Sequence, residues 1–292
     1  MIITYCSSSR GLAKSIGSAA AIPVVDASCR RFPDGEQFVK VLGDVRGQDV
    51  AVICTTALNP DTLFMEYSLI IDAVKGSGCK SVTGVMPYMA YARQDSRFNM
   101  GEPLSAKLFA KLIEDAGTDR IITVDLHLHR FKKIEEIFSI PAVNLTAMPL
   151  LADYYGQTHE TEATTVAGPD MESGQWASVV ARRLGVGFTI LEKERKGDRE
   201  VRVSGELTEV GRRVVLVDDI ISTGKTLIEV ISKLKSRGAA RIDALVTHAL
   251  LVEDALPKMI EAGLDELIST DTVPGAHSKV SVAPLIAEAL KR

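Results

Sequence analysis

Two adjacent carboxylates, Asp218 and Asp219, stand at the head of a polar loop in residues 214–227, VVLVDDIISTGKTL. The loop contains residues that could surround a phosphate: Ser222, Thr223, Gly224, Lys225 and Thr226. Small side chains and the backbone N–H groups at a helix start suit a phosphate, which the acids would repel unless they bind another part of the ligand. Carboxylates accept hydrogen bonds from hydroxyls. The pattern therefore predicts a sugar phosphate, with the phosphate in the loop and the ribose diol on the acids.

The Gly-Lys-Thr ending also matches the tail of an ATP-binding P-loop. That motif requires a glycine five positions before its second glycine, and this position is Asp219. The P-loop interpretation therefore fails. The structural alternative is an acidic helix N-terminus favoured by the helix dipole. The coincidence of small residues and two acids at one strand end favours the ligand site.

Two other strand ends carry polar side chains. Residues 87–98 (PYMAYARQDSRF) could hold a nucleotide, and a solvated turn would contain the same residue types. In residues 122–131 (ITVDLHLHRF), Asp125, His127 and His129 are spaced by two and would share a face if the strand continued. The His-x-His pattern suggests zinc, but no cysteine or third nearby histidine completes such a site.

Three charged segments each leave two interpretations open. Residues 31–37 (RFPDGEQ) predict a hairpin with a Pro-Asp-Gly turn, whose aromatic residue either packs on the protein or stacks on adenine. In residues 189–203 (TILEKERKGDREVRV), Lys193 and Arg195 project together from an extended chain, into solvent or over a reacting group. In residues 167–177 (AGPDMESGQWA), Asp170 lies between a strand and a helix.

Short apolar runs alternate with helical stretches and would position these residues. The strand-like runs lie at 50–54, 82–86, 121–124, 164–167, 188–191, 214–217, 245–251 and 266–269. Several are apolar throughout, as in parallel strands buried on both faces. Helices are expected at 61–75, 103–116, 175–184 and 226–237. The order predicts an α/β fold with mainly parallel sheets flanked by crossover helices.

The length of 292 residues suits two domains, and we place the boundary within residues 140–147. The predicted domains are residues 1–144 and 145–292, each with a small parallel sheet, although the halves show no strong sequence repeat. A net charge of −4 argues against a nucleic-acid partner. No apolar run approaches the roughly 18 residues of a membrane span. Scattered cysteines without C-x-x-C pairs and the lack of a signal-peptide pattern predict a cytoplasmic location.

The apolar strand, two acids and Ser/Thr/Gly loop of residues 214–226 resemble the signature of the type I phosphoribosyltransferase fold. That family handles 5-phosphoribosyl 1-pyrophosphate (PRPP). The resemblance implies that Asp218 and Asp219 hold the ribose hydroxyls and that residues 222–226 hold the 5-phosphate. It leaves open whether PRPP is consumed or made.

Four segments that precede the first motif resemble signatures of the ribose-phosphate pyrophosphokinases, which make PRPP; in chain order they are RFPDGEQ, YARQD, DLH and KER. The resemblance implies ATP and ribose 5-phosphate as substrates and Mg²⁺ as cofactor. Its implied ATP contacts are Phe32, Asp34, Glu36, Arg93, Gln94 and Asp95. It also implies catalytic roles for Lys193 and Arg195 and metal-binding roles for His127 and Asp170. The role of His129 stays open.

The same resemblance implies a homo-oligomer, at least a dimer, in which residues 31–37 reach the ATP site of a neighbouring subunit. The predicted reaction transfers the β,γ-diphosphoryl group of ATP to the C1 hydroxyl of ribose 5-phosphate, giving AMP and PRPP. A phosphoribosyltransferase that consumes PRPP would share residues 214–226 but not the other motifs. A catalytically silent regulatory homologue is the alternative from another class, and the retained lysine, arginine, histidine and acids argue against it.

Overall fold

The computed structural model of the chain describes residues 1–196, 200–204 and 212–292. The chain forms two compact units, and each has its own sheet. The first unit consists of Met1–Thr146 and Val282–Arg292, and the second of Ala147–Ser281. Within the described part of the chain, no helix is both long and apolar enough to cross a membrane.

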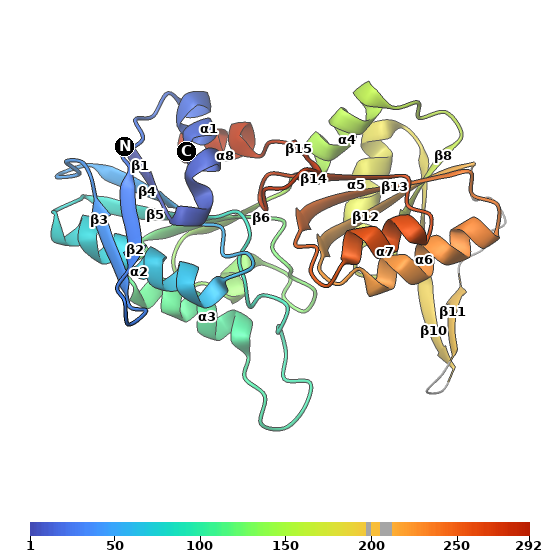
Figure 1. Cartoon of the computed structure of the whole chain (residues 1–292), viewed down its shortest axis with the longest axis horizontal. Helices are drawn as coiled ribbons and strands as arrows, with labels where there is room; N and C mark the ends of the chain where they lie inside the picture. Colours follow the sequence, from blue (N-terminus) through green and yellow to red (C-terminus); the bar gives the residue numbers. More distant parts are fainter. Residues whose placement is uncertain (197–199, 205–211) are drawn as a thin grey trace. The chain divides into compact units, whose positions relative to one another are not determined.

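The first unit is built on a five-stranded parallel sheet with the strand order β1-β4-β5-β6-β7. Its strands are β1 (Ile2–Tyr5), β4 (Asp49–Ile53), β5 (Ser81–Met86), β6 (Arg120–Val124) and β7 (Ala142–Leu145), with a separate hairpin of β2 (Ala27–Arg31) and β3 (Gln37–Val41). Its helices are α1 (Arg10–Ala20), α2 (Pro60–Gly76), α3 (Ser105–Asp115) and α8 (Ala283–Leu290). As Figure 1 shows, α1 and α8 lie on one face of the sheet, and α2 and α3 lie on the other.

The second unit is built on a six-stranded parallel sheet with the order β9-β8-β12-β13-β14-β15. Its strands are β8 (Thr164–Gly168), β9 (Gly187–Ile190), β12 (Arg213–Ile221), β13 (Arg241–Ala249), β14 (Glu266–Thr270) and β15 (Ser278–Val280), with a separate hairpin of β10 (Glu192–Lys196) and β11 (Glu200–Ser204). Its helices are α4 (Met148–Thr158), α5 (Gly174–Leu184), α6 (Lys225–Ser236) and α7 (Ala255–Glu261). Helices α4 and α5 cover one face, and α6 and α7 cover the other (Figure 1).

Successive residues of the second sheet are buried alternately against the two helix layers. In β12, Val214 and Leu216 belong to the core beneath α6 and α7, whereas Val215 and Val217 belong to the core beneath α4 and α5. Because side chains alternate across a strand, a strand covered on both faces must be apolar at every position. This burial explains why the run at 214–217 has no polar alternation.

The two units repeat one order of elements. The series β8, α5, β9, hairpin, β12, α6, β13, α7, β14, β15 has a counterpart in β1, α1, hairpin, β4, α2, β5, α3, β6, β7. In place of β9, the first unit has a single parallel bridge from Ile3 to Val24. The halves thus share a fold without a strong sequence repeat, because many apolar sequences satisfy the same pattern of burial.

Each unit receives one helix from the chain segment that leaves the other sheet. Helix α4 follows β7 of the first sheet and packs on α5 in the second unit. Helix α8 follows β15 of the second sheet and packs on α1 in the first unit. The predicted assignment of residues 282–292 to the second domain therefore differs from the structure. The reason is that buried residues of α8, including Ile286 and Ala287, complete the layer above the first sheet.

The predicted α/β fold with parallel sheets and flanking helices is confirmed. The main difference lies at the end of β12, where we expected a loop after position 217. The strand instead keeps its register with β13 as far as the pair Ile221 and Ala249. Asp218 and Asp219 therefore belong to the strand, and the loop before α6 is shortened to residues 222–224.

Candidate active site

The sugar-phosphate loop predicted in the second unit is a tight turn between β12 and α6. Gly224 is the N-cap of α6 and has φ +69°, a left-handed conformation that favours glycine. A Cβ atom at this position would also lie 3.2 Å from Sδ of Met259. Because Gly224 has no side chain, α6 begins without the side-chain cap that commonly satisfies first-turn N–H groups. Such a helix start suits an anion.

The other predicted loop residues line this turn with different exposure. Ser222, Thr223 and Thr226 are half-buried, and Lys225 is exposed. All of them lie within the turn or the first residues of α6, so the structure brings them together as the sequence predicted. Nothing in the turn is larger than threonine except Lys225, which leaves the backbone accessible to a ligand.

Asp218 and Asp219 form a negatively charged pair at the end of β12. Asp219 is buried, Asp218 is half-buried, and the backbone N–H of Asp219 donates to Oδ1 of Asp218 at 3.0 Å. Burial raises the pKa of Asp218 well above its ordinary value, and the charges of Asp219 and Asp170 raise it further. Three carboxyl groups, from the ends of β8 and β12, thus repel one another. Such a cluster is stabilised by hydroxyl donors or by a divalent cation.

Asp170 lies in a turn that the sequence analysis placed correctly between β8 and α5. Its Oδ1 accepts the Ser173 backbone N–H at 2.9 Å, and the Asp170 N–H donates to the Ser173 hydroxyl at 3.1 Å. A Cβ atom on Gly168 would approach that hydroxyl to 2.6 Å. The turn is therefore closed by its own side chains, and the fully buried Ser173 has a structural role.

Lys193 and Arg195 lie in β10, which pairs antiparallel with β11. The extended backbone that the prediction required is present, since Lys193 is opposite Val203 and Arg195 is opposite Val201. The charged run at 189–203 is therefore a strand hairpin attached after β9, the edge strand of the second sheet. Residues 197–199 lie outside the described part.

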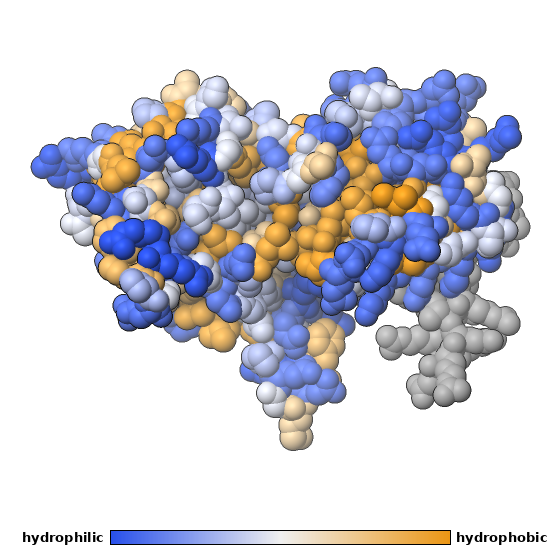
Figure 2. Space-filling view, viewed as in Figure 1, coloured by the Kyte–Doolittle hydropathy of each residue, from blue (hydrophilic) through white to orange (hydrophobic). Residues whose placement is uncertain are grey.

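Residues 87–102 of the first unit contain predicted ATP contacts, and we call this segment the nucleotide loop. Glu102 organises its second part, residues 94–102. Its carboxylate accepts the backbone N–H groups of Phe98 and Asn99 at 2.9 and 3.1 Å, and the side-chain amides of Asn99 and Gln94 at 2.6 and 3.1 Å. These hydrogen bonds, that of the Asn99 side chain first, lower the pKa of Glu102. The segment projects beside α3 in Figure 1, and its surface in Figure 2 is mostly hydrophilic.

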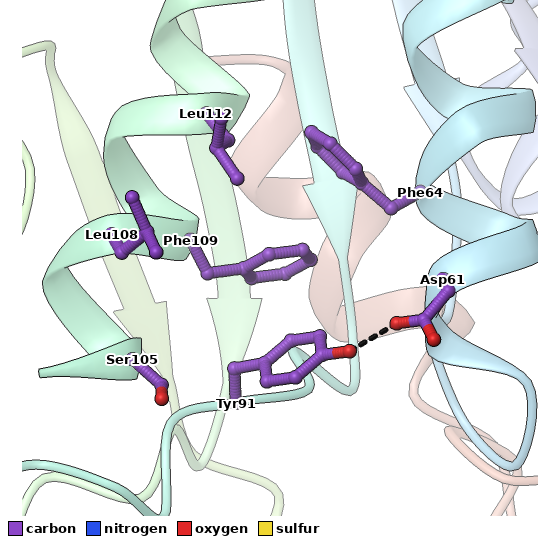
Figure 3. Close-up of a pocket in the computed structure, with 7 residues that line it drawn as sticks. All are labelled: Asp61, Phe64, Tyr91, Ser105, Leu108, Phe109 and Leu112. Carbon is purple, nitrogen blue, oxygen red and sulfur yellow. Dashed lines mark hydrogen bonds between the residues drawn. The ribbon is translucent and has the colours of Figure 1, made fainter. Parts of the chain in front are cut away.

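Tyr91 anchors the same loop to an apolar pocket of about 240 Å³ between α2 and α3 (Figure 3). Its hydroxyl donates a short hydrogen bond to Asp61, and its ring lies 5.0 Å from that of Phe109. Tyr91 also has φ +62°, which is strained for a bulky residue. Strain of this kind persists only where surrounding contacts enforce it. The anchor fixes the chain two residues before the predicted ATP contact Arg93, which is exposed.

His127 and His129 are in direct contact after β6, in residues 125–131, which we call the histidine loop. Nε2 of His129 lies 2.9 Å from Nδ1 of His127, and the rings are perpendicular with centroids 3.6 Å apart. A hydrogen bond at Nδ1 fixes the orientation of the His127 ring. The shared strand face that we considered for Asp125, His127 and His129 required the strand to continue, but β6 ends at Val124, and the two histidines meet in a loop. Asp125 has φ +39° and is buried, so the strand does not continue through it.

The predicted hairpin of residues 31–37 is also present, as the tip of β2 and β3. Gly35 has φ +97°, and Oδ1 of Asp34 accepts the Glu36 N–H at 3.1 Å. Phe32 packs edge-to-face on Phe38 and remains 39% exposed. The aromatic residue thus packs partly on its own hairpin and keeps a surface that could contact another molecule.

Asp95 is placed differently from the other predicted ATP contacts. Its side chain is 1% exposed, and it accepts hydrogen bonds from the side chain and the backbone of Arg130. Sequence reasoning did not single out Arg130, Glu102 or Asn144, whose partners are assembled by the fold. Glu102 accepts hydrogen bonds from amide groups within eight residues of it. The sequence alone does not show which amide groups point toward its carboxylate.

Comparisons with known proteins cover both units. A family model described as the N-terminal domain of ribose phosphate pyrophosphokinase matches residues 1–117, and a phosphoribosyl transferase domain model matches residues 133–283. The ribose-phosphate pyrophosphokinase of Methanopyrus kandleri is 40% identical over 262 residues, covering 89% of this chain and 88% of the relative. That of Methanothermobacter thermautotrophicus is 38% identical over 292 residues, covering 99% and 100%.

A solved structure gives the same result at the level of the fold. The phosphoribosylpyrophosphate synthetase from Mycobacterium smegmatis is similar with a TM-score of 0.89 and 31% sequence identity. The similarity covers 99% of this chain and 97% of that chain. Both units and their chain order are thus shared with that protein.

Proposed function

The chain belongs to the ribose-phosphate pyrophosphokinase family, and from this premise we propose how its residues divide the reaction between them. The activity is transfer of the β,γ-diphosphoryl group of ATP to the C1 hydroxyl of ribose 5-phosphate, giving PRPP and AMP. The observation that carries it is the nearly full-length similarity to a PRPP synthetase.

The second unit binds ribose 5-phosphate in this proposal. The 5-phosphate occupies the turn of residues 222–226, where Gly224 exposes the start of α6. The ribose hydroxyls donate to Asp218 and Asp219, which supply acceptors at the end of β12. This ligand explains why two acids precede a phosphate site. Its hydroxyls donate hydrogen bonds to the carboxylates, and its phosphate accepts hydrogen bonds from backbone N–H groups.

The first unit binds ATP. Arg93 and Gln94 contact the nucleotide from the loop that Tyr91 and Glu102 hold in place. Phe32, Asp34 and Glu36 contact the adenine of a neighbouring subunit from the tip of the β2–β3 hairpin. The support for this second assignment is the partial exposure of Phe32 at the end of a projecting hairpin. It requires a homo-oligomer, at least a dimer.

Mg²⁺ is the proposed cofactor, and His127 and Asp170 are the residues that would hold it. The donor set fits at Asp170, because oxygen ligands suit Mg²⁺, and because burial and the charges of Asp219 and Asp170 raise the pKa of the neighbouring Asp218. When bound, the ion neutralises phosphate charge and polarises the reacting phosphoryl group. The hydrogen bond between His127 and His129 orients the His127 ring for this role.

The proposed reaction is a direct transfer between the two substrates and requires no covalent bond to the protein. The C1 oxygen of ribose 5-phosphate bonds to the β-phosphorus of ATP, and the bond from that phosphorus to the AMP oxygen breaks. Positioning and charge stabilisation supply most of the acceleration in such transfers. Lys193 and Arg195 are the proposed catalytic cations, brought from the β10–β11 hairpin to the transferring group. We place the enzyme in the cytoplasm, where its nucleotide substrate is available.

Phosphorus NMR of the purified protein with ATP, ribose 5-phosphate and magnesium tests this function. Joint appearance of AMP and PRPP is the expected result. ATP left intact, with PRPP consumed only when a nucleobase is added, would make the protein a transferase and overturn the ATP assignments. The absence of both reactions with intact ATP binding would identify a silent homologue.

A further inference from the structure

The side chain of Asp95 connects the nucleotide loop to the histidine loop. Oδ1 of Asp95 accepts a hydrogen bond from Nη1 of Arg130 at 2.9 Å, and Oδ2 accepts the backbone N–H of Arg130 at 3.1 Å. The Asp95 side chain is 1% exposed, whereas that of Arg130 is 49% exposed. A buried carboxylate is thus neutralised from the protein's surface by a single arginine.

The histidine loop is held by hydrogen bonds at both of its ends, and the pair of Asp95 and Arg130 is one of these contacts. At the beginning of the histidine loop, the backbone N–H of Leu126 donates to Oδ1 of Asn144 at 2.9 Å. At its end, Arg130 binds Asp95 through both its backbone and its side chain. His127 and His129 lie between these two points. The histidine pair is therefore held at both ends, once by β7 and once by the nucleotide loop.

Arg130 also contacts the far part of the nucleotide loop. Its guanidinium lies 4.8 Å from the centroid of the Phe98 ring. The backbone N–H of Phe98 donates a hydrogen bond to Glu102. One arginine thus touches the loop on both sides of residues 96–97. A guanidinium can serve both contacts because it is planar, stacks on an aromatic face and keeps several donors at its edge.

We propose that Arg130 is a positioning residue that locks the histidine loop to the nucleotide loop through Asp95, so that the proposed metal and ATP contacts keep one geometry. In this role Asp95 acts through Arg130 and does not itself contact ATP. A direct contact would require the buried carboxylate to exchange its arginine for a nucleotide that carries several negative charges. Such an exchange is unfavourable, because a buried ion that loses its partner is strongly destabilised.

The inference rests on the proposed roles of Arg93, Gln94 and His127. The experiments below distinguish a failure of this inference from a failure of those roles. Arg130→Gln removes the charge and the ring contact but keeps the backbone hydrogen bond to Asp95. We expect the KM for ATP to rise about tenfold, as for the loss of a coupled pair, while the KM for ribose 5-phosphate changes less than about twofold. Asp95→Asn should have a similar effect, and the double variant should be no worse than either single variant.

Two controls make the test specific. Arg183 of α5 has an exposure similar to that of Arg130, and its ion pair with Asp153 lies in the second unit; Arg183→Gln should leave both KM values unchanged. Arg130→Lys restores the charge without the planar fork and should recover part of the ATP affinity. Amide hydrogen exchange at Arg130 and Phe98 should be faster in Arg130→Gln than in the parent protein, and unchanged in Arg183→Gln.

Equal rises in both KM values, or additive effects of the two single changes, would overturn the inference. So would unchanged ATP binding by Arg130→Gln, provided that Arg93→Ala and His127→Ala weaken it. If these last two variants bind Mg-ATP normally, the proposed nucleotide roles fail instead. Should Arg130→Gln not fold, Arg130→Lys and Asp95→Asn, compared in the same assays, decide the question.

Discussion

Replacing Gly224 with alanine gives the sharpest test of the phosphate turn. Gly224 has φ +69°, and a Cβ atom there would lie 3.2 Å from Sδ of Met259. An L-residue in this conformation costs about 1–2 kcal/mol. The contact with Met259 adds strain, because Met259 is fully buried and can move only by tenths of an ångström. The turn must therefore either bear this cost or change its backbone conformation.

A changed backbone would misdirect the N–H groups that the proposal assigns to the 5-phosphate. If the whole cost of about 1–2 kcal/mol falls on the bound state, the affinity for ribose 5-phosphate decreases about 5- to 30-fold. The measurements are the KM for ribose 5-phosphate at saturating ATP and the dissociation constant from calorimetry. Neither should change for ATP, because the proposed ATP contacts lie in the first unit.

Gly185 provides a matched control in the same unit. It has φ +70° and ends α5 as its C-cap, and a Cβ atom at this position would meet no other atom within 4 Å. Gly185→Ala should therefore lower the melting temperature through the same backbone strain without changing the KM for ribose 5-phosphate. An unchanged KM in Gly224→Ala, or an equal rise in Gly185→Ala, would refute the assignment of the phosphate to this turn.

Three further predictions concern separate parts of the site. Lys193→Ala should lower kcat by about 100- to 1,000-fold, as expected for loss of a transition-state cation, with a modest effect on the KM for ribose 5-phosphate; near-normal turnover would remove Lys193 from catalysis. Asp218→Asn combined with Asp219→Asn should weaken ribose 5-phosphate binding more than ATP binding in calorimetry, and loss of ATP binding alone would mean that the two sites are reversed. Because its hydrogen bonds lower the pKa of Glu102 below 4.5, they should persist above pH 4.5 and be lost as the pH falls through the lowered pKa. Hydrogen exchange at Phe98 and Asn99 should therefore rise only in acid, whereas Glu102→Gln should show fast exchange already at pH 7; slow exchange in that variant would show that other contacts hold the loop.

The sequence predicted those features whose causes are local. Continuous apolar runs such as 214–217 indicated strands buried on both faces, and the structure confirms them. A Pro-Asp-Gly turn predicted the β2–β3 hairpin, and the small residues of 222–226 predicted the turn before α6. In each case the residues that determine the feature are neighbours in the chain.

Features that depend on distant partners were not predicted. The ion pair of Asp95 and Arg130 joins residues 35 positions apart, and nothing near either residue marks the other. The extension of β12 through Asp218 and Asp219 depends on β13, which supplies backbone partners as far as Ala249. Likewise, the return of α8 to the first unit depends on its packing against α1, which begins at Arg10.

The repeated fold has different side chains at the corresponding strand ends of the two units. β4 is the counterpart of β12, and its end is followed by Thr55 and Thr56 rather than by acids. The hydroxyl of Ser9 accepts the Thr55 backbone N–H at 2.8 Å, and the hydroxyl of Thr56 accepts the Ala90 N–H at 2.8 Å. One side chain of the first unit thus binds a backbone group after β4, and Thr56 binds the chain that follows β5. In the second unit, two carboxylates lie near the end of β12 and Gly224 follows it, so the fold provides the position and the local residues determine its chemistry.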